Sequence, residues 1–357
     1  MTATPQAASS AEGEGSLGRQ LVARMGDITR HRIRELALAN ELGNRAHFST
    51  GRSIRALADA PPGRGDSAVV IAAGPSLHRT DTAGELKRAG YQGALVVTDS
   101  AMRYCLKHGI VPDLVVTLDP HAKRIVRWFG DPDLTEEHLR EDDYFARQDM
   151  DRAFADEMRA NDEMLELLDR HGRNMRIAIS SCSSASVVQR ARATGMDIYW
   201  WNPMLDDPEQ DPANSATRAL YRANRWPCIN AGGNVGTACW MIAHAVLGKQ
   251  RVALTGVDFS YYDDTPYSAT QYYREALELV GEERLASVFM REFNPHLQRW
   301  FYSDPAYMWY RDIFREMAAD ADCTTYNCTG GGLLFGDPIR FAPLAQFLAA
   351  TGTPGIG

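Results

Sequence analysis

The sequence lacks the residue groupings that mark several common classes of protein. Its six cysteines are scattered over 357 residues and form no CxxC pair, which argues against a structural zinc site. No apolar run approaches the roughly 20 residues that a membrane-spanning helix needs. We therefore expect a cytoplasmic protein with reduced thiols and no membrane span.

The chain also lacks an excess of positive charge. Its 38 Lys and Arg side chains stand against 46 Asp and Glu side chains, a net charge of −8 at pH 7. A general nucleic-acid-binding protein needs a basic surface to neutralise phosphates, so we expect no nucleic-acid partner. The N-terminal segment has no apolar core, which predicts a disordered lead-in over residues 1–16 and no secretion signal.

What is present is an alternating pattern that follows a helical segment. Apolar residues at three- and four-residue spacing predict an N-terminal helical arm over residues 17–60. PPGRGDS then breaks the chain, and residues 61–357 are predicted to form the main domain. There, short apolar runs such as AVVIAA, ALVVTD and DLVVTLD alternate with helical segments. This alternation predicts an α/β fold, a Rossmann-like, mostly parallel sheet with helices on both faces.

Residues 131–173 interrupt this alternation with a dense run of charged residues. Their helical pattern predicts an insertion, either a solvated hairpin or a lid. The α/β pattern then resumes with predicted strands at MRIAIS, DIYWW and RVALTGVDF. We expect helices from there to about residue 320, and a last short strand in CTTYNCTGGG.

Small or polar residues follow nearly every predicted strand. Parallel strands bring their carboxyl ends to one edge of the sheet, and open sheets bind ligands at that edge. The endings therefore predict a polar rim around a ligand crevice. They are Gly74-Pro75-Ser76, Asp99-Ser100, Asp119-Pro120, Ser180 to Ser184, Asn202, Asp258 and Asn327.

Two turns of this rim have the character of anion sites. Gly74 lets the backbone turn sharply, Pro75 fixes the turn, and Ser76 can offer its hydroxyl and amide to an anion. The turn NAGGNVG precedes a helix, so its amides can form an anion nest; it contains Gly232, Gly233 and Asn234. Neither turn matches G-x-G-x-x-G or G-x-S-x-G, which disfavours a dinucleotide fingerprint and a nucleophile elbow.

Two aspartates of the rim are candidates for metal or ligand contact. Asp99 and Asp119 end strands that we expect to be neighbours, roughly 4.8 Å apart. Both carboxylates could then reach one ligand or a Mg²⁺ ion. The alternative for Asp99 is that it caps the helix that follows. His78, His121 and His296 lie near rim segments, but single histidines of this kind are more often structural than catalytic.

Three blocks of the sequence resemble one known family. IAAGPSL, TDSAMRYCLKHGIVPDLVVTLDP and GGNVGTACWMIAHAVLGKQRVALTGVDFSY are similar to segments of the motility-associated factor (Maf) flagellin glycosyltransferases. These enzymes share an MptE-like domain with archaeal 6-hydroxymethylpterin pyrophosphokinases. The ending TTYNCTGGGLLFGDPI is similar as well, so the resemblance covers residues 45–349 except the charged insertion.

A more distant resemblance links the chain to bacterial CMP-sialic acid sialyltransferases. Their GNGPS and GIDFY segments are similar to AAGPS and GVDFS here. Ala73 stands where that family has asparagine, and WFYSDPAYMWYRDIF lacks the family's histidine base. The base is therefore unassigned, because His296 lies nearby without matching it. The resemblance implies that a nucleotide-sugar site is lined by Gly74, Pro75, Ser76, Gly232, Gly233 and Asp258.

The second block is also similar to the metal-binding segment of pterin and thiamine pyrophosphokinases, whose aspartates hold Mg²⁺ and the transferring diphosphate. Asp99, Asp113 and Asp119 are kept, whereas Thr117 replaces the first aspartate of the DLD segment and Pro120 replaces its glycine. Losing one metal carboxylate disfavours Mg²⁺-dependent diphosphoryl transfer, because the triphosphate charge needs that ion.

The leading hypothesis is a glycosyltransferase that moves a nonulosonic (sialic-acid-like) sugar from a CMP-linked donor to Ser or Thr of an acceptor protein such as flagellin. It requires no cofactor, and its candidate catalytic residues are Asp258 and Asp119. The donor would bind at Gly74, Pro75, Ser76, Asp99, Ser100, Asn202, Gly232, Gly233, Asn234 and Asn327. The alternatives are a Mg–ATP-dependent 6-hydroxymethylpterin-type pyrophosphokinase with Asp99 and Asp119 on Mg²⁺, and a non-catalytic nucleotide- or glycan-binding module.

Overall fold

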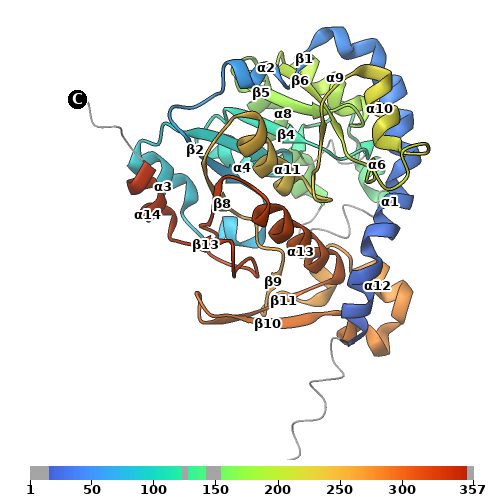
Figure 1. Cartoon of the computed structure of the whole chain (residues 1–357), viewed down its shortest axis with the longest axis vertical. Coiled ribbons are helices and arrows are strands. Elements are labelled where there is room, and N and C mark those ends of the chain that lie inside the picture. The colour runs from blue at the N-terminus through green and yellow to red at the C-terminus, as the bar shows by residue number, and fades with distance from the viewer. Residues whose placement is uncertain (1–15, 123–127, 142–153, 352–357) are drawn as a thin grey trace, which may run out of the picture.

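A ten-stranded parallel sheet organises the computed structural model, which describes residues 16–122, 128–141 and 154–351 (Figure 1). The lead-in predicted for residues 1–16 lies outside this range except for its last residue. In sheet order the strands are β1 (Arg52–Ser53), β6 (Asp197–Pro203), β5 (Arg176–Ser180), β4 (Leu114–Thr117), β3 (Ala94–Thr98), β2 (Ser67–Ile71), β8 (Arg251–Thr255), β12 (Thr324–Asn327) and β13 (Arg340–Phe341), with β7 (Cys228–Ile229) beside β6.

The order of the strands reverses once, between β2 and β8. From β2 the chain adds β3, β4, β5 and β6 on one side, and then returns to place β8 on the other side of β2. The two strands pair in parallel from Ser67↔Arg251 to Ile71↔Thr255. In open α/β sheets, ligands bind at such a point, in a crevice outside the carboxyl ends of the strands; we call the region around the segments that follow β2 and β8 the crevice.

Both faces of the sheet are buried, as the continuous apolar runs predicted. Val70, Val96 and Val116 face one helical layer, and Val69, Val97 and Val115 face the other. The first layer contains α11 (Val235–Met241), its π-helical continuation Ile242–Val246, and α13 (Pro305–Ala319). The second contains α3 (Thr82–Ala89), α4 (Asp99–Lys107), α8 (Phe154–His171), α9 (Ala185–Ala193) and α14 (Leu344–Thr351). The predicted α/β class is confirmed.

The described parts of the charged segment 131–173, residues 131–141 and 154–173, pack into the fold and do not form an insertion beside it. Its helix α8 connects β4 to β5, the place of a crossover helix in a βαβ unit. Met164 and Leu168 are fully buried against the sheet, and Glu163 pairs with Arg103 of α4. The charged residues hid this apolar stripe from sequence reasoning. The other helix described in this segment is α6 (Glu136–Glu141), and residues 142–153 lie outside the described range.

A second sheet replaces part of the helical region predicted up to residue 320. It is antiparallel, with the order β10 (Met290–Asn294), β11 (Arg299–Ser303) and β9 (Tyr261–Tyr262). Helix α12 (Tyr273–Val280) lies between β9 and β10 in the chain. The alternation of buried and exposed residues in MREFN is typical of a half-buried strand. Because β9 follows β8 closely, this sheet begins beside the crevice.

The N-terminal segment 17–60 is built into the main fold. Helix α1 (Ser16–Asn44) confirms its helical pattern, but β1 then joins the large sheet as an edge strand beside β6. The Asn40 amide donates to Pro120 O and Cys182 O, and the Asn44 amide donates to Ser181 O and Ser183 O. Helix α1 therefore covers the carboxyl ends of β4 and β5. Helices α2 (Ala56–Asp59) and α10 (Ala216–Asn224) complete the described α-helices. Among the described helices, none has the length and apolar character needed to cross a bilayer.

Removing the Asn44 side chain should destabilise the fold. Asn44 is fully buried and donates at 2.9 Å and 2.8 Å to the carbonyl oxygens of Ser181 and Ser183. Asn44→Ala leaves both acceptors unsatisfied, so we expect the free energy of unfolding to fall by about 1–3 kcal/mol. Urea titration followed by circular dichroism measures this. Leu42→Ala, at a position 64% exposed on the same helix, is the control and should change it by less than about 0.5 kcal/mol; equal effects would contradict the role of Asn44.

Candidate functional site

The loops that follow β2 and β8 lie against each other at the crevice. The Gly74 amide donates to Gly256 O at 2.8 Å, continuing the contact of the two strands beyond their ends. A Cβ on Gly74 would overlap Gly256 O, and a Cβ on Gly256, where φ is +67°, would overlap Ala72 O. Both positions need glycine because the two backbones approach so closely.

Ser76 and Asp258 join these two loops by two hydrogen bonds. The Ser76 amide donates to Asp258 Oδ2 at 2.6 Å, and its hydroxyl donates to Asp258 Oδ1 at 2.5 Å. The Leu77 amide donates to Gly74 O, and Pro75 has no amide hydrogen. The donors of the Gly-Pro-Ser turn are thus used within the protein, which contradicts the prediction that Ser76 offers its hydroxyl and amide to an anion.

The Asp258 carboxyl group is buried, and only 3% of the residue is exposed. Burial raises its pKa from 3.8 to about 6, although the two Ser76 hydrogen bonds and the nearby charge of Arg79 favour the ionised form. This placement suits a residue that holds two loops together better than one that meets an acceptor hydroxyl. The catalytic role predicted for Asp258 stays a prediction.

The glycine turn before α11 reaches the same crevice from the helical layer. Asn234 caps α11 by accepting the Thr237 amide at 2.9 Å. A Cβ on Gly236 would lie 3.8 Å from the Ala72 side chain and 4.0 Å from that of Val257. The start of α11 therefore packs directly on the ends of β2 and β8, so the structure brings together the two glycine-containing segments of the predicted rim.

Backbone amides of this turn are available to a ligand. Gly232 and Gly233 have φ of +54° and +81°, and the Gly232 amide donates to Asn230 Oδ1. The amides of Gly233, Val235 and Gly236 donate to no acceptor within the described part of the chain. The anion-binding character predicted for the rim thus rests on this turn.

The two aspartates of the rim follow the neighbouring strands β3 and β4, as predicted. Thr98 is the N-cap residue of α4 and accepts the Ala101 amide. Asp99 is the first residue of this helix, and its Oδ1 accepts the Ser100 amide at 2.7 Å, so it bonds to the first turn of the helix without being its N-cap. Asp99 is 1% exposed. It lies near Cys239 of α11, whose pKa is raised first by burial and then by the Asp99 charge. Asp119 is partly exposed and accepts the His121 amide at 2.8 Å.

Ser100 lies beside Asp99 in the first turn of α4, and its hydroxyl is 3.1 Å from that of Thr98. Across residues 16–122, 128–141 and 154–351 no group of three or more His, Cys, Asp or Glu side chains could hold a metal ion. A Mg²⁺ ion held by Asp99 and Asp119 would therefore need phosphate or water oxygens as its other ligands.

Two predicted donor-binding residues are structural. Asn202 is fully buried at the end of β6, where its amide donates to Asn224 Oδ1 and Trp226 O and its oxygen accepts from Ser181. Asn327, also fully buried, donates to Leu334 O and accepts the Thr329 amide. Neither side chain has an exposed atom for a ligand. The ends of β5 and β6 are closed off, so the crevice is narrower than the predicted rim.

The histidines lie at the margins of the crevice. His296, in the turn between β10 and β11, stacks on Phe341 of β13 with ring centroids 4.6 Å apart. His78 follows the Gly-Pro-Ser turn and is exposed, with its ring edge-on to Tyr104 of α4. Neither placement identifies His296 or His78 as the base that would take the proton of the acceptor hydroxyl.

Several residues that border the crevice were missed by sequence reasoning. Arg79 and Tyr262 lie beside the Ser76–Asp258 pair, with the Arg79 guanidinium 3.9 Å from the Tyr262 ring centroid. On the helical side, a Cβ on Gly233 would come within 2.7 Å of both Trp309 and Tyr310 of α13. The signal in WFYSDPAYMWYRDIF is its density of aromatic residues, two of which, Trp309 and Tyr310, lie against the α11 turn.

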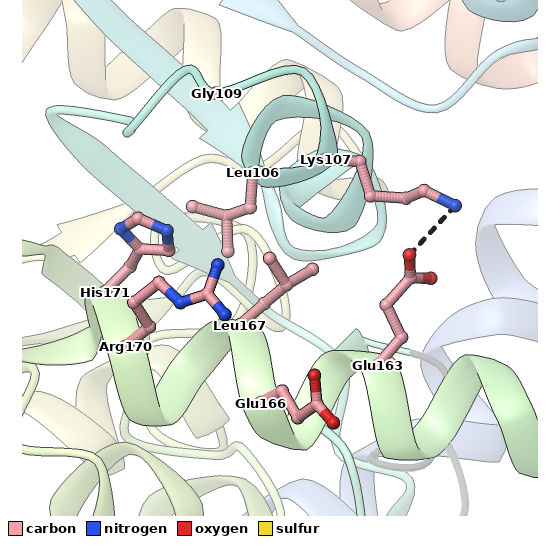
Figure 2. Close-up of a pocket in the computed structure, with 8 residues that line it drawn as sticks. All are labelled: Leu106, Lys107, Gly109, Glu163, Glu166, Leu167, Arg170 and His171. Atoms are coloured by element: carbon pink, nitrogen blue, oxygen red, sulfur yellow. Dashed lines mark ion pairs between the residues drawn. The ribbon is translucent and has the colours of Figure 1, made fainter.

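A separate pocket of about 380 Å³ lies between α4 and α8 (Figure 2). Its walls include Lys107 and Gly109 at the end of α4 and His171 at the end of α8. Because α4 starts at the carboxyl end of β3, its last turn lies toward the opposite edge of the sheet. Lys107 Nζ pairs with Glu163 across the pocket at 3.0 Å. This pocket is therefore not part of the crevice at β2 and β8.

Comparisons with known proteins agree with the resemblance seen in the sequence. Residues 39–129 match the family described as 6-hydroxymethylpterin diphosphokinase MptE-like. This segment contains β2, β3, β4 and the Gly-Pro-Ser turn. No curated protein matches the sequence.

Among solved structures, the chain is similar to the Maf glycosyltransferase from Magnetospirillum magneticum AMB-1, with a TM-score of 0.50 and 16% sequence identity. The likeness covers 80% of this chain and 35% of that protein, so the chain spans about a third of the length of its structural neighbour. These matches confirm the resemblance to the Maf and MptE-like proteins and the fold that it implied.

The raised pKa of Asp258 should make stability depend on pH. Because this carboxyl holds its proton more tightly in the folded than in the unfolded protein, its contribution to stability is full below pH 3.8 and is lost as pH rises through about 6. Relative to Asp258→Asn, we expect the wild-type free energy of unfolding to fall by on the order of 2–3 kcal/mol between pH 4 and pH 7. Urea titrations at several pH values test this, and parallel pH profiles for the two proteins would contradict it.

Proposed function

We propose that the protein is a glycosyltransferase that uses a CMP-linked nonulosonic sugar as its donor. The observation that carries the proposal is the reversal of strand order between β2 and β8, where the glycine turn of α11 packs on both strand ends. Ligands of open α/β sheets bind at this place. The fold similarity to a Maf glycosyltransferase supports the same reading.

The available donors suggest how the CMP phosphate is held. The amides of Gly233, Val235 and Gly236 make no other hydrogen bond among the described residues, and fixed amides stabilise charge that develops on a leaving phosphate. Trp309, partly exposed beside Gly233, offers a face on which the cytosine ring can stack. In this arrangement the Gly-Pro-Ser turn shapes the wall of the site while the α11 turn binds the phosphate.

The proposal for the acceptor substrate rests on the family resemblance. We propose that a Ser or Thr hydroxyl of an acceptor protein such as flagellin attacks the anomeric carbon of the sugar in the cytoplasm. A general base must take the hydroxyl proton as the bond to phosphate breaks. Asp119 fits this role better than Asp258, because it is partly exposed at the end of β4 whereas Asp258 is buried.

Nucleotide titration tests the donor proposal. Isothermal titration calorimetry with CMP should show binding in the absence of divalent ions, because amides and not a metal hold the phosphate. A Gly233→Val variant places a branched side chain against Trp309 and Tyr310 and should lose CMP binding. Gly248→Val is the control for backbone strain, because both glycines have positive φ and nothing lies within 4 Å of a Cβ added at Gly248. Tight Mg–ATP binding with no CMP binding would refute the proposal.

The pyrophosphokinase alternative is favoured by one finding, the match of residues 39–129 to the diphosphokinase MptE-like description. In that reaction Mg²⁺ bridges the transferring diphosphate. Asp99 and Asp119 would hold it from β3 and β4.

Metal removal separates the two reactions. We expect wild-type protein to release CMP from a CMP-linked nonulosonate in excess EDTA, because the proposed transfer uses no metal. Turnover of 6-hydroxymethylpterin with Mg–ATP, measured as AMP release, should be absent. The reverse pattern, with AMP release that EDTA and Asp119→Asn both abolish, would instead establish the pyrophosphokinase. Release of CMP also rejects a purely binding role.

A further inference from the structure

The pocket between α4 and α8 lies apart from the crevice and has the size of a small-molecule site. Its volume is about 380 Å³, and sites for small ligands begin at roughly 300 Å³. The α8 residues that line it are three or four positions apart, so they share the face of that helix that is turned toward α4. The lining residues are Glu163, Glu166, Leu167, Arg170 and His171 from α8, with Leu106, Lys107 and Gly109 from the end of α4.

The middle of the pocket is apolar, and its two ends are charged. Leu106 and Leu167 are buried and belong to the same hydrophobic core cluster. Figure 2 shows Lys107 with Glu163 on one side of these leucines, and Arg170 with His171 on the other side. A ligand that lies on the leucines would therefore meet a different polar group at each end.

The carboxylate of Glu163 is fully engaged by two cations. It accepts a hydrogen bond from Arg103 Nε at 2.8 Å and pairs with Lys107 Nζ at 3.0 Å. Burial acts to raise the pKa of Glu163, but the contacts with Arg103 and Lys107 hold it below its usual value. The ionised carboxylate thus faces two positive charges, and this end of the pocket has no uncompensated negative charge that would repel an anion.

Arg170, at the other end of the pocket, has no such partner. Its exposed guanidinium makes no hydrogen bond or ion pair with any residue that the structure describes, and neither does the carboxylate of Glu166 one turn earlier. A cation in the last turn of a helix is favourable because of the helix dipole, which explains Arg170 but not the apolar floor beside it. In a protein of net charge −8, an uncompensated guanidinium next to an apolar surface fits an organic anion.

We propose that this pocket is a second ligand site, which binds a sugar monophosphate through Arg170 and His171. A planar guanidinium gives a phosphate two parallel hydrogen bonds, and the histidine ring can donate another. The sugar lies over Leu106 and Leu167, and the unpaired carboxylate of Glu166 accepts one of its hydroxyl groups. A second phosphate group would meet the negative charge of Glu166, which favours a monophosphate. Because the pocket is separate from the crevice, this inference does not depend on the proposed function.

Calorimetry with glucose 6-phosphate, inorganic phosphate and glucose tests the assignment. We expect wild-type protein to bind glucose 6-phosphate, to bind inorganic phosphate more weakly, and not to bind glucose. Arg170→Gln should weaken binding of glucose 6-phosphate about tenfold or more, the size of a lost charge-assisted hydrogen bond. Glu166→Ala should weaken binding of glucose 6-phosphate but not of inorganic phosphate. Arg173→Gln is the matched control and should change neither affinity, because Arg173 lies against Gly195 and does not line the pocket.

Each other result overturns the assignment in a recognisable way. Wild-type protein that binds neither phosphate probe has no such site. Equal losses in Arg170→Gln and Arg173→Gln would mean a general effect of surface charge. Binding that survives Arg170→Gln but is lost in Gly233→Val would place the phosphate at the α11 turn and not in this pocket. CMP binding by Arg170→Gln should equal that of wild type, and equal unfolding midpoints establish that affinity, and not folding, has changed.

Discussion

The hydrogen bonds between Ser76 and Asp258 are the contact on which the candidate site depends. They join the ends of β2 and β8, the two strands between which the strand order reverses. Burying a carboxyl group is unfavourable unless its oxygens are hydrogen-bonded, and Ser76 supplies both donors. With the two loops held in this way, the α11 turn packs against their ends, and Arg79 stacks on Tyr262 beside them.

Two segments cover other parts of the sheet edge and so limit the extent of the candidate site. Helix α1 closes the ends of β4 and β5 through Asn40 and Asn44, and the glycine loop after β12 closes the edge beyond β8, where Leu333 donates to Asp258 O. Asp119, which follows β4, stays partly exposed beside this cover.

The sequence predicted the class of fold and the general place of the site for a clear physical reason. Fully buried parallel strands leave continuous β-branched runs, and their polar ends must gather on one edge. Sequence reasoning failed where the decisive contacts join distant segments. The charges of α8 concealed a buried stripe with Met164 and Leu168, and Asn202 and Asn327 resembled ligand contacts until the structure showed their amides to be fully used in the interior.

By itself, the sequence determined that this chain forms a parallel α/β sheet with motifs that resemble those of the Maf and MptE-like proteins, because local periodicity and short motifs carry that information. Only the tertiary structure decided which polar residues have free hydrogen-bonding groups and which are bonded within the protein. Ser76 and Asp258 are 182 positions apart, and Tyr262 and Arg299 meet through an antiparallel pairing that no local pattern encodes. Whether a hydrogen-bond donor is free or already bonded depends on such distant partners, so the free donors expected at the Gly-Pro-Ser turn are found instead among the amides of the α11 turn.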